Sequence, residues 1–183
     1  MRVVLQRVLS ASVTVDGKTI SKIGKGIMCL VGIRDNDDQA CSEVLAKKIL
    51  DVRLWDDDKG KPWSKSVKDM GYEVLLVSQF TLFGSVKQKP RPDYHRSMGA
   101  DDARVFFNRF VDHVKKTYQE DKVQTGEFQA YMNVELQNDG PVTLIMDTDE
   151  YDGAVDYVRK QLEKAEKCKR CLSKVVMFRR TQV

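Results

Sequence analysis

The chain has 183 residues, of which 42% are hydrophobic, and a formal net charge of +4. These values are typical of a single globular domain with a substantial core, and they argue against a division into two domains. The first 17 residues alternate and carry Arg2 and Arg7, which is too interrupted for a signal-peptide core or a membrane span. A mitochondrial presequence would share their Arg and Ser content, but the alternation is that of a strand. We therefore expect a cytoplasmic protein with no membrane partner.

The positive charge is concentrated toward the C-terminal end. Residues 159 to 183 contain nine Lys or Arg and two Glu, a net charge of +7, which leaves −3 on the rest of the chain. A basic tail on a mildly acidic body indicates phosphate contact, although a solvated helix face is built from the same residues. The tail also holds Cys168 and Cys171, a single C-x-x-C. Because one such pair is half a zinc site, two reduced thiols are favoured, and no metal or cofactor is expected.

In chain order, the N-terminal part begins as antiparallel hairpins. Residues 2–8 and 12–15 alternate apolar and polar side chains, an Asp-Gly turn follows, and residues 19–23 alternate again. After a Gly-Lys-Gly turn, the apolar run 27–33 predicts a strand that is buried on both faces.

Asp37 and Asp38 are predicted to precede a helix that runs through Ile49, because acidic residues favour a helix start and the apolar residues that follow recur at helical spacing. Residues 52–55 predict a strand. The acidic stretch that follows predicts a turn, since it lacks the spaced carboxylates and the terminal glutamate of a calcium loop. Residues 73–82 predict a further strand.

The C-terminal half starts with a long basic loop, residues 84–99, which contains two prolines. A helix that begins at Asp101 carries one apolar side suited to the core. Two strands, 130–136 and 142–147, flank an Asn-Asp-Gly-Pro turn, and a last helix covers about 150–167. Runs of strands with a few inserted helices predict an α+β fold with a mostly antiparallel, barrel-like sheet.

The familiar catalytic motifs are missing. A Ser-His-Asp triad needs a histidine to accept the hydroxyl proton, and the chain has two, His95 and His113. His95 lies in the basic loop and could approach Thr81, but nothing else in the sequence supports that pair. No G-x-x-x-x-G-K-[ST], G-x-G-x-x-G or H-E-x-x-H occurs. The sequence therefore does not favour nucleotide hydrolysis, dinucleotide redox chemistry or zinc proteolysis, because each of these usually depends on one of the three motifs.

Two stretches place small polar residues where a buried strand should be apolar: VSQFTLFG at 77–84 and NDGPVTL at 138–144. Where the first strand enters a turn, the amides near Phe80 and Thr81 could point at one oxygen and stabilise the charge that develops in ester hydrolysis. Alternatively, Ser78 and Thr81 cap the strand end through local hydrogen bonds. Taken alone, the stretch favours this second interpretation.

The combination of motifs is more specific than either one. Gly140-Pro141 alone is an ordinary turn signal. However, GPVT at 140–143 and SQFTL at 78–82, behind QRV at 6–8, together closely resemble the D-aminoacyl-tRNA deacylase family. ASVTVDG, the GKG-apolar strand, the RP of the basic loop and QTG match as well. The resemblance implies an ester hydrolase that releases D-amino acids from D-aminoacyl-tRNA as a chiral proofreading step.

The resemblance also implies how the chain is organised. Residues 1–147 would be the deacylase domain, and residues 148–183 would be a C-terminal helix with a basic tail. Members of the family are homodimers of barrel-like halves, and each active site lies at the interface between two subunits.

Carried over to this chain, the resemblance implies a pocket for the tRNA 3′ end and its ester, lined by Ser78, Gln79, Phe80 and Thr81. Main-chain amides around Phe80 and Thr81 would form the oxyanion site. Gly140 and Pro141, joined by a cis bond, would enter the other subunit's pocket, where the glycine carbonyl meets the substrate's α-ammonium group. Arg7 would hold that loop in place.

An editing enzyme of this kind has to recognise handedness at Cα and not a side chain. Rigid main chain can fix the ammonium and carbonyl groups, and steric exclusion can exceed the ~1 to 3 kcal/mol that an extra methylene is worth in a soft pocket. Glycine has no side chain to exclude, so glycyl-tRNA mischarged on other tRNAs is an expected second substrate. The attacking group is either Thr81 or a water assisted by the RNA 2′-hydroxyl, and the lack of a nearby base favours water.

The resemblance also implies tRNA as the binding partner of the basic loop and the tail. Loop cations are expected to contact acceptor-stem phosphates: Lys87, Lys89, Arg91 and Arg96. Two other functions remain open. One is a nucleic-acid-binding protein without catalysis, which would bind RNA or DNA regardless of aminoacylation. The other is a general esterase with a Thr81 nucleophile and His95 as its base.

Overall fold

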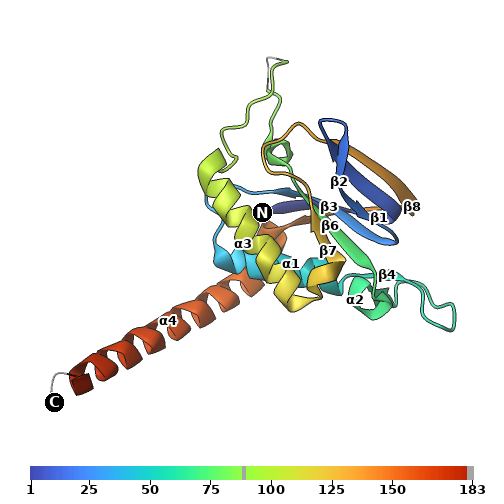
Figure 1. Ribbon diagram of the computed structural model, residues 1–183. Helices are drawn as coiled ribbons and strands as arrows, with labels where there is room; N and C mark the ends of the chain where they lie inside the picture. Colours follow the sequence, from blue (N-terminus) through green and yellow to red (C-terminus); the bar gives the residue numbers. More distant parts are fainter. Residues whose placement is uncertain (88–89, 181–183) are drawn as a thin grey trace.

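The centre of the fold is a six-stranded sheet (Figure 1). The computed structural model describes the backbone of residues 1–87 and 90–180, and side chains through residue 169. The strands are β1 (Arg2–Val15), β2 (Lys18–Ile23), β3 (Gly26–Gly32), β6 (Glu73–Ser78), β7 (Val123–Thr125) and β8 (Asn133–Asp147). β2 also contacts β6 and β7, so the sheet curls toward a barrel.

The sheet is mixed. β1 pairs antiparallel with β2, β3 and β8, whereas β3 with β6 and β6 with β7 are parallel. The α+β class and the barrel-like sheet are confirmed, but the mostly antiparallel pairing is not. Helical crossovers explain the parallel pairings. Along the chain, α1 lies between β3 and β6, and α3 lies between β6 and β7. A crossover of this kind returns the chain so that the next strand runs parallel to the preceding one.

Three predicted strands differ in extent. β1 is one continuous strand, because β8 pairs along nearly its whole length. β8 is also one strand, in which the residues between Asn138 and Thr143 bulge out opposite Arg7. The strand predicted over residues 73–82 ends at Ser78, and a 3-10 turn, η1 (Phe80–Phe83), follows it.

The helices lie mainly on one side of the sheet. They are α1 (Gln39–Asp51), α2 (Val67–Met70), α3 (Ala100–Thr117) and α4 (Asp152–Arg180), with 3-10 turns η2 (Glu120–Lys122) and η3 (Thr148–Tyr151). A small separate sheet joins β4 (Arg53–Trp55) to β5 (Lys65–Ser66). α1 begins where the sequence predicts, because the Asp38 carboxylate accepts a hydrogen bond from the Cys41 amide at 3.0 Å.

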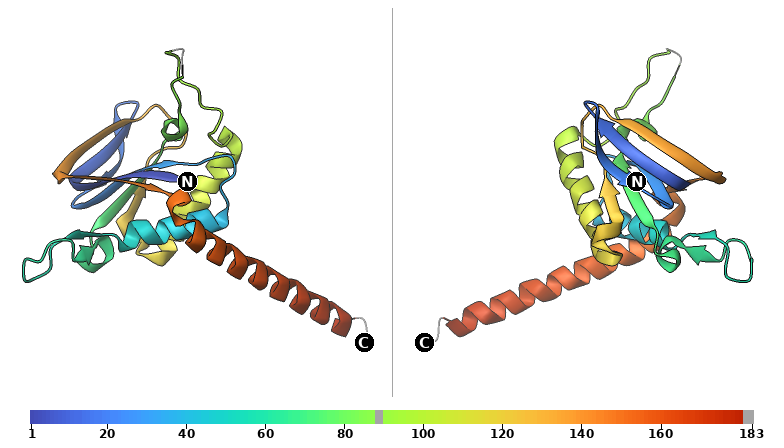
Figure 2. Two further views of the ribbon diagram at one scale, coloured as in Figure 1. Left: turned by 180° about the vertical axis from the view of Figure 1, so that it is seen from behind. Right: turned by 45° about the vertical axis from the view of Figure 1, so that its right-hand side comes forward.

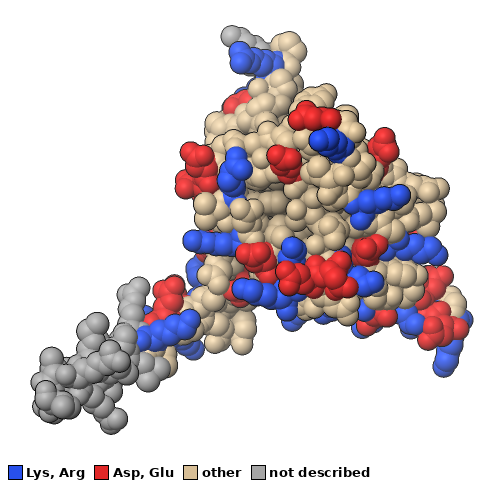
Figure 3. Space-filling view, viewed as in Figure 1, with Lys and Arg blue, Asp and Glu red and all other residues tan. Residues whose placement is uncertain are grey.

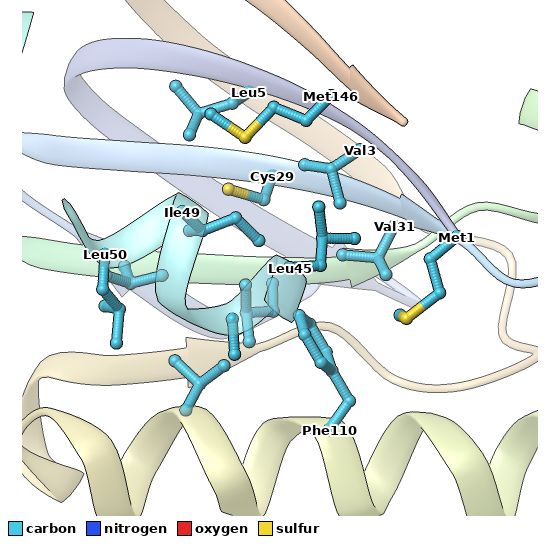
Figure 4. Close-up of a cluster of buried hydrophobic side chains, with 14 of the residues drawn as sticks. Met1, Val3, Leu5, Cys29, Val31, Leu45, Ile49, Leu50, Phe110 and Met146 are labelled. Atoms are coloured by element: carbon cyan, nitrogen blue, oxygen red, sulfur yellow. The ribbon is translucent and has the colours of Figure 1, made fainter. Parts of the chain in front are cut away.

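Two hydrophobic clusters bury the two faces of the sheet. The larger cluster fills the space between the sheet and helices α1 and α3, and Figure 4 shows Leu45 and Phe110 reaching toward Val31. The smaller cluster lies inside the curl of the sheet and includes Met28 and Leu75. β3 and β6 contribute to both clusters, so the expected two-sided burial of residues 27–33 is confirmed.

Helix α4 starts on the body and then leaves it. Val155 is buried and Leu162 packs against the larger cluster, whereas every described side chain from Glu163 to Lys169 is exposed. The helix runs away from the sheet, and the described residues of the 84–99 loop rise at the opposite end of the molecule (Figure 2). Cys168 is a free, exposed cysteine. The side chain of Cys171 lies outside the described residues.

A membrane-spanning helix is not found: none of the helices within the described residues is both long and apolar enough to cross a bilayer.

Candidate active site

A pocket of about 530 Å³ opens where the parallel strands β3 and β6 end. Its lining is mostly apolar and comes from four segments. They are represented by Val31 in β3, by Ser78, Gln79 and Phe80 at the end of β6, by Tyr94 and Ser97 in the basic loop, and by Tyr131 and Met132 before β8. The structure thus brings three of the four predicted pocket residues to one cavity. Thr81 follows them in the turn but does not line the pocket.

The turn η1 leaves two backbone amides without a hydrogen-bond partner among the described residues. The Gln79 amide makes the last sheet contact, to the Val31 carbonyl at 2.8 Å. The next two amides, of Phe80 and Thr81, begin the turn and therefore have no acceptor inside it. Within the described residues, no other hydrogen bond uses either amide. Adjacent free N–H groups beside a pocket can stabilise a developing oxyanion.

Several contacts fix this turn in place. The Ser97 hydroxyl donates to the Phe80 carbonyl at 2.9 Å, and the Phe80 ring packs edge-on against Tyr94 with centroids 5.1 Å apart. Gly32 lies beneath the turn, where a Cβ atom would be only 3.0 Å from Leu82. The basic loop and β3 therefore both position the end of the pocket.

The hydroxyl of Thr81 is not paired with a base. It accepts a hydrogen bond from the Gln79 side-chain amide at 2.5 Å. The His95 Nδ1 atom lies 2.6 Å from Asp93, and the hydrogen bond from His95 lowers the pKa of the Asp93 carboxyl to about 2. Among the described residues, no contact joins His95 to Thr81, so the arrangement needed for the esterase hypothesis is not assembled here.

The Gly140-Pro141 peptide bond is cis, and the segment around it is held at both ends. The Asn138 side chain accepts from the Val142 amide at 2.8 Å and donates to the Thr143 hydroxyl at 3.1 Å. These bonds close the bulge that projects from β8.

Arg7 holds the same bulge from β1. Its Nε atom donates to the Asp139 carbonyl at 3.2 Å and lies 3.1 Å from the Asp139 carboxylate. Its Nη1 atom also donates to the Leu54 carbonyl, which ties the bulge to β4. The position of Arg7 is therefore consistent with the role that the resemblance implies for it.

The bulge and the pocket of one chain are apart. Arg7, opposite the bulge, pairs with Ile27, and Ile27 pairs with Val74 on β6. Val74 lies four residues before Ser78, which is about 13 Å along a strand. Neither Gly140 nor Pro141 lines the pocket, and both are exposed.

The predicted tRNA-binding residues lie on the basic loop. Lys87, Arg91 and Arg96 are exposed, whereas Lys89 lies outside the described residues. Basic side chains lie on the described part of the loop at the top of the molecule, and charges of both signs form a band over the helices below (Figure 3). In the described part of the chain, no group of three His, Cys, Asp or Glu side chains could hold a metal ion.

Sequence reasoning missed the far wall of the pocket. Gln129 adopts a left-handed backbone with φ of +67°, and Tyr131 is 89% exposed beside the cavity. An isolated tyrosine or glutamine between two strands has no periodic or motif signal, so only the tertiary structure reveals that these residues line the same pocket as Ser78.

The fold and the pocket define a mixed α+β protein with a ligand-sized cavity at the ends of parallel strands, beside unpartnered backbone amides. The chain belongs to the D-Tyr-tRNA(Tyr) deacylase family, whose model matches residues 4–147. The family indicated by the two motifs is therefore confirmed.

Individual proteins agree with this assignment. D-aminoacyl-tRNA deacylase 1 of Mus musculus is 47% identical over 167 residues, which is 91% of this chain and 79% of that protein. D-aminoacyl-tRNA deacylase of Plasmodium falciparum is 42% identical over 158 residues, covering 81% of this chain and 96% of that protein. A solved structure described as c-Myc DNA Unwinding Element Binding Protein is 48% identical with a TM-score of 0.77, covering 80% of this chain and 98% of that one.

Proposed function

We propose that the chain hydrolyses the ester bond of D-aminoacyl-tRNA and releases a free D-amino acid and tRNA. The observation that carries the proposal is the pair of unpartnered amides at Phe80 and Thr81, placed beside an apolar pocket in a chain of the deacylase family. Such a site can polarise an ester carbonyl without an ionisable side chain. The substrate would place the protein in the cytoplasm, where tRNA is aminoacylated.

One assay tests this function. The protein is incubated with D-tyrosyl-tRNA, L-tyrosyl-tRNA, glycyl-tRNA and a small activated ester, and release of the acyl group is followed. Hydrolysis of the D-tyrosyl and glycyl esters with the L ester spared supports the proposal. Binding of all three tRNA species without hydrolysis would instead support a non-catalytic nucleic-acid-binding protein, and hydrolysis of the small ester alone would support a general esterase.

The active site is proposed to be completed by a second copy of the chain. β8 pairs with β1 only, so one edge of this 15-residue strand is free in the described chain. The strand exposes Ile145 at 65% and Leu144 at 37%, next to the exposed Gly140 and Pro141. A long free edge with apolar side chains is a ready surface for pairing with another chain. Since the bulge does not reach its own pocket, a dimer can bring it to the partner's pocket.

Selection of the D form would follow from this insertion. Gly140 would present its carbonyl to the substrate's α-ammonium group, and the bulge, held by Arg7 and Asn138, would close the direction that an L side chain needs. Because the barrier is steric, it would act on every L residue alike, and glycine would pass.

Replacing Thr81 with alanine is expected to leave kcat within about threefold of the wild-type value. A hydroxyl that takes no part in the reaction contributes little to transition-state stabilisation, so its loss changes kcat little. The Thr81 hydroxyl already pairs with Gln79, and no base among the described residues contacts it. Single-turnover hydrolysis of D-tyrosyl-tRNA measures this, with a parallel substrate whose terminal ribose lacks the 2′-hydroxyl. A complete loss of turnover in a folded Thr81→Ala protein would make the threonine the nucleophile; slow hydrolysis of the deoxy substrate supports RNA-assisted water.

Loop cations and the tail are proposed to contact tRNA phosphates. Deleting residues 168–183 removes five Lys or Arg and no acidic residue. If they neutralise phosphates, the slope of log K against log salt should become shallower by up to about 0.9 for each lost contact. An unchanged slope rejects the tail's role. α4 and the basic loop point to opposite ends of the molecule, so the two contacts would lie on separate parts of the RNA or on different subunits (Figure 2).

A further inference from the structure

Two arginines enclose the ring that ends the 80–83 turn. The Arg2 guanidinium lies 5.1 Å from the centroid of the Phe83 ring, and the Arg34 guanidinium lies 5.8 Å from it. Phe83 itself is buried. A cation held over an aromatic face is attracted by the ring quadrupole, and more strongly when the pair is shielded from water. Arg2 comes from β1 and Arg34 from the segment that follows β3, so residues of the sheet and its edge hold the turn through this ring.

Arg2 also binds the backbone of the turn. Its Nη1 atom donates to the Leu82 carbonyl at 3.0 Å, and its Nε atom donates to the Asp147 carboxylate at 2.8 Å. The last carbonyl groups of a helical turn receive no hydrogen bond from an N–H group inside the turn. A donor from elsewhere is therefore needed to fix their direction. Ser97 fixes the Phe80 carbonyl at the start of the same turn. Both ends of the segment that carries the two free amides are thus held by side chains.

Carboxylates at the end of β8 and just after it orient the two arginines. Asp147 is buried and binds Arg2, while Asp149 binds Arg34 through both guanidinium nitrogens at 2.9 and 2.6 Å. The hydrogen bond from Arg34 lowers the pKa of the Asp149 carboxyl and so favours its charged form. Bidentate pairs of this kind restrict the guanidinium in direction as well as position. The arginines are therefore preset before any substrate binds.

We propose that Arg2 is a positioning residue for the hydrolytic step. It does not line the pocket. It acts through the Leu82 carbonyl and the Phe83 ring, which keep the amides of Phe80 and Thr81 aimed at the place where the ester oxygen becomes negative. The inference rests on the proposed deacylase function and assigns to the first residue of β1 a part in catalysis beyond its part in the sheet.

Three variants test this inference: Arg2→Met, Arg2→Lys and the control Lys68→Met. Lys68 forms an ion pair with Asp51 and is 38% exposed, against 37% for Arg2, but it lies on α2 away from the pocket. Single-turnover and steady-state hydrolysis of D-tyrosyl-tRNA are measured with thermal unfolding of each protein. Arg2→Met should lower kcat ~10- to 100-fold at a KM within about twofold, because small misplacement of reacting groups is costly. Arg2→Lys should recover part of kcat, since an ammonium can donate to Leu82 but lacks the planar fork.

The kcat and KM values separate positioning from stability. A merely structural role would lower the unfolding temperature of Arg2→Met and leave kcat per folded molecule unchanged, and that result would overturn the inference. A raised KM with normal kcat would overturn it as well. If Arg2→Met does not fold, the Arg2→Lys protein decides in the same way: a kcat equal to that of Lys68→Met contradicts the proposal. A wild-type protein that fails to cleave D-tyrosyl-tRNA would refute the proposed function itself.

Discussion

The Gly140→Ala protein is expected to lose at least about 100-fold in kcat/KM for D-tyrosyl-tRNA, comparable to a roughly 1 Å misplacement of a reacting group. Gly140 has φ of +124°, a region that L side chains rarely adopt. A Cβ atom there would lie 2.8 Å from the Val142 Cγ2 atom and 3.2 Å from the Arg7 Nη2 atom. The bulge would have to move, and with it the carbonyl proposed to meet the substrate's ammonium group.

Gly153→Ala provides the matched control. Gly153 lies on α4, and a Cβ atom built there has no neighbour within 4 Å. Its kinetic constants should stay at wild-type values. If the Gly140→Ala protein has the same kinetic constants as Gly153→Ala, the bulge is not part of the active site.

Mixed dimers test whether the bulge serves the partner's pocket. Ser78→Tyr should fill the cavity and inactivate its own pocket, while Gly140→Ala should inactivate the pocket into which its bulge projects. In a dimer of these two proteins, one pocket keeps both an intact lining and an intact bulge. Random 1:1 exchange in a two-fold dimer should therefore restore about a quarter of wild-type activity. If bulge and pocket of one chain worked together, the mixture would stay inactive.

Sequence patterns predicted those parts of the fold that depend on local periodicity. The alternation of residues 2–8, the apolar run 27–33 and the helix cap at Asp38 each correspond to an element of the structure. The parallel pairings of β3, β6 and β7 were not predictable in this way, because period-two alternation is the same for either strand direction. Direction is set by the crossover helices, which are a tertiary feature.

The residues of the candidate site also fall into two groups, those that local sequence patterns predicted and those that depend on tertiary contacts. Ser78 and Gly140 stand in short motifs whose polar residues interrupt a strand pattern, so the sequence marked them. The end of β6 at Ser78 was missed because Phe80 and Leu82 continue the apolar alternation, although their backbone turns. Arg2 was missed as well, since an arginine at the start of a strand is usually exposed, and its contact with Leu82 joins residues 80 positions apart.

Phe80→Pro is expected to lower kcat ~100- to 1,000-fold, the usual effect of removing one oxyanion donor. Proline deletes the Phe80 amide hydrogen, and the first position of a helical turn tolerates its fixed φ. Gln79 before it has φ of −145° and ψ of 86°, outside the helical region that a following proline disfavours. The turn can therefore persist while the donor is lost.

Phe80→Ala separates the amide from the ring. This variant also loses the edge contact with Tyr94 but keeps the N–H group, so its kcat should fall by no more than about tenfold, in line with the ~0.5 to 1.5 kcal/mol of an aromatic pair. Both proteins are compared with wild type by single-turnover hydrolysis of D-tyrosyl-tRNA and by circular dichroism. Equal kcat values for the proline and alanine variants would mean that the Phe80 amide is not a donor to the reacting oxygen. A large gap between them would assign the catalytic stabilisation to main chain, which is how a site without a paired base can cleave an ester.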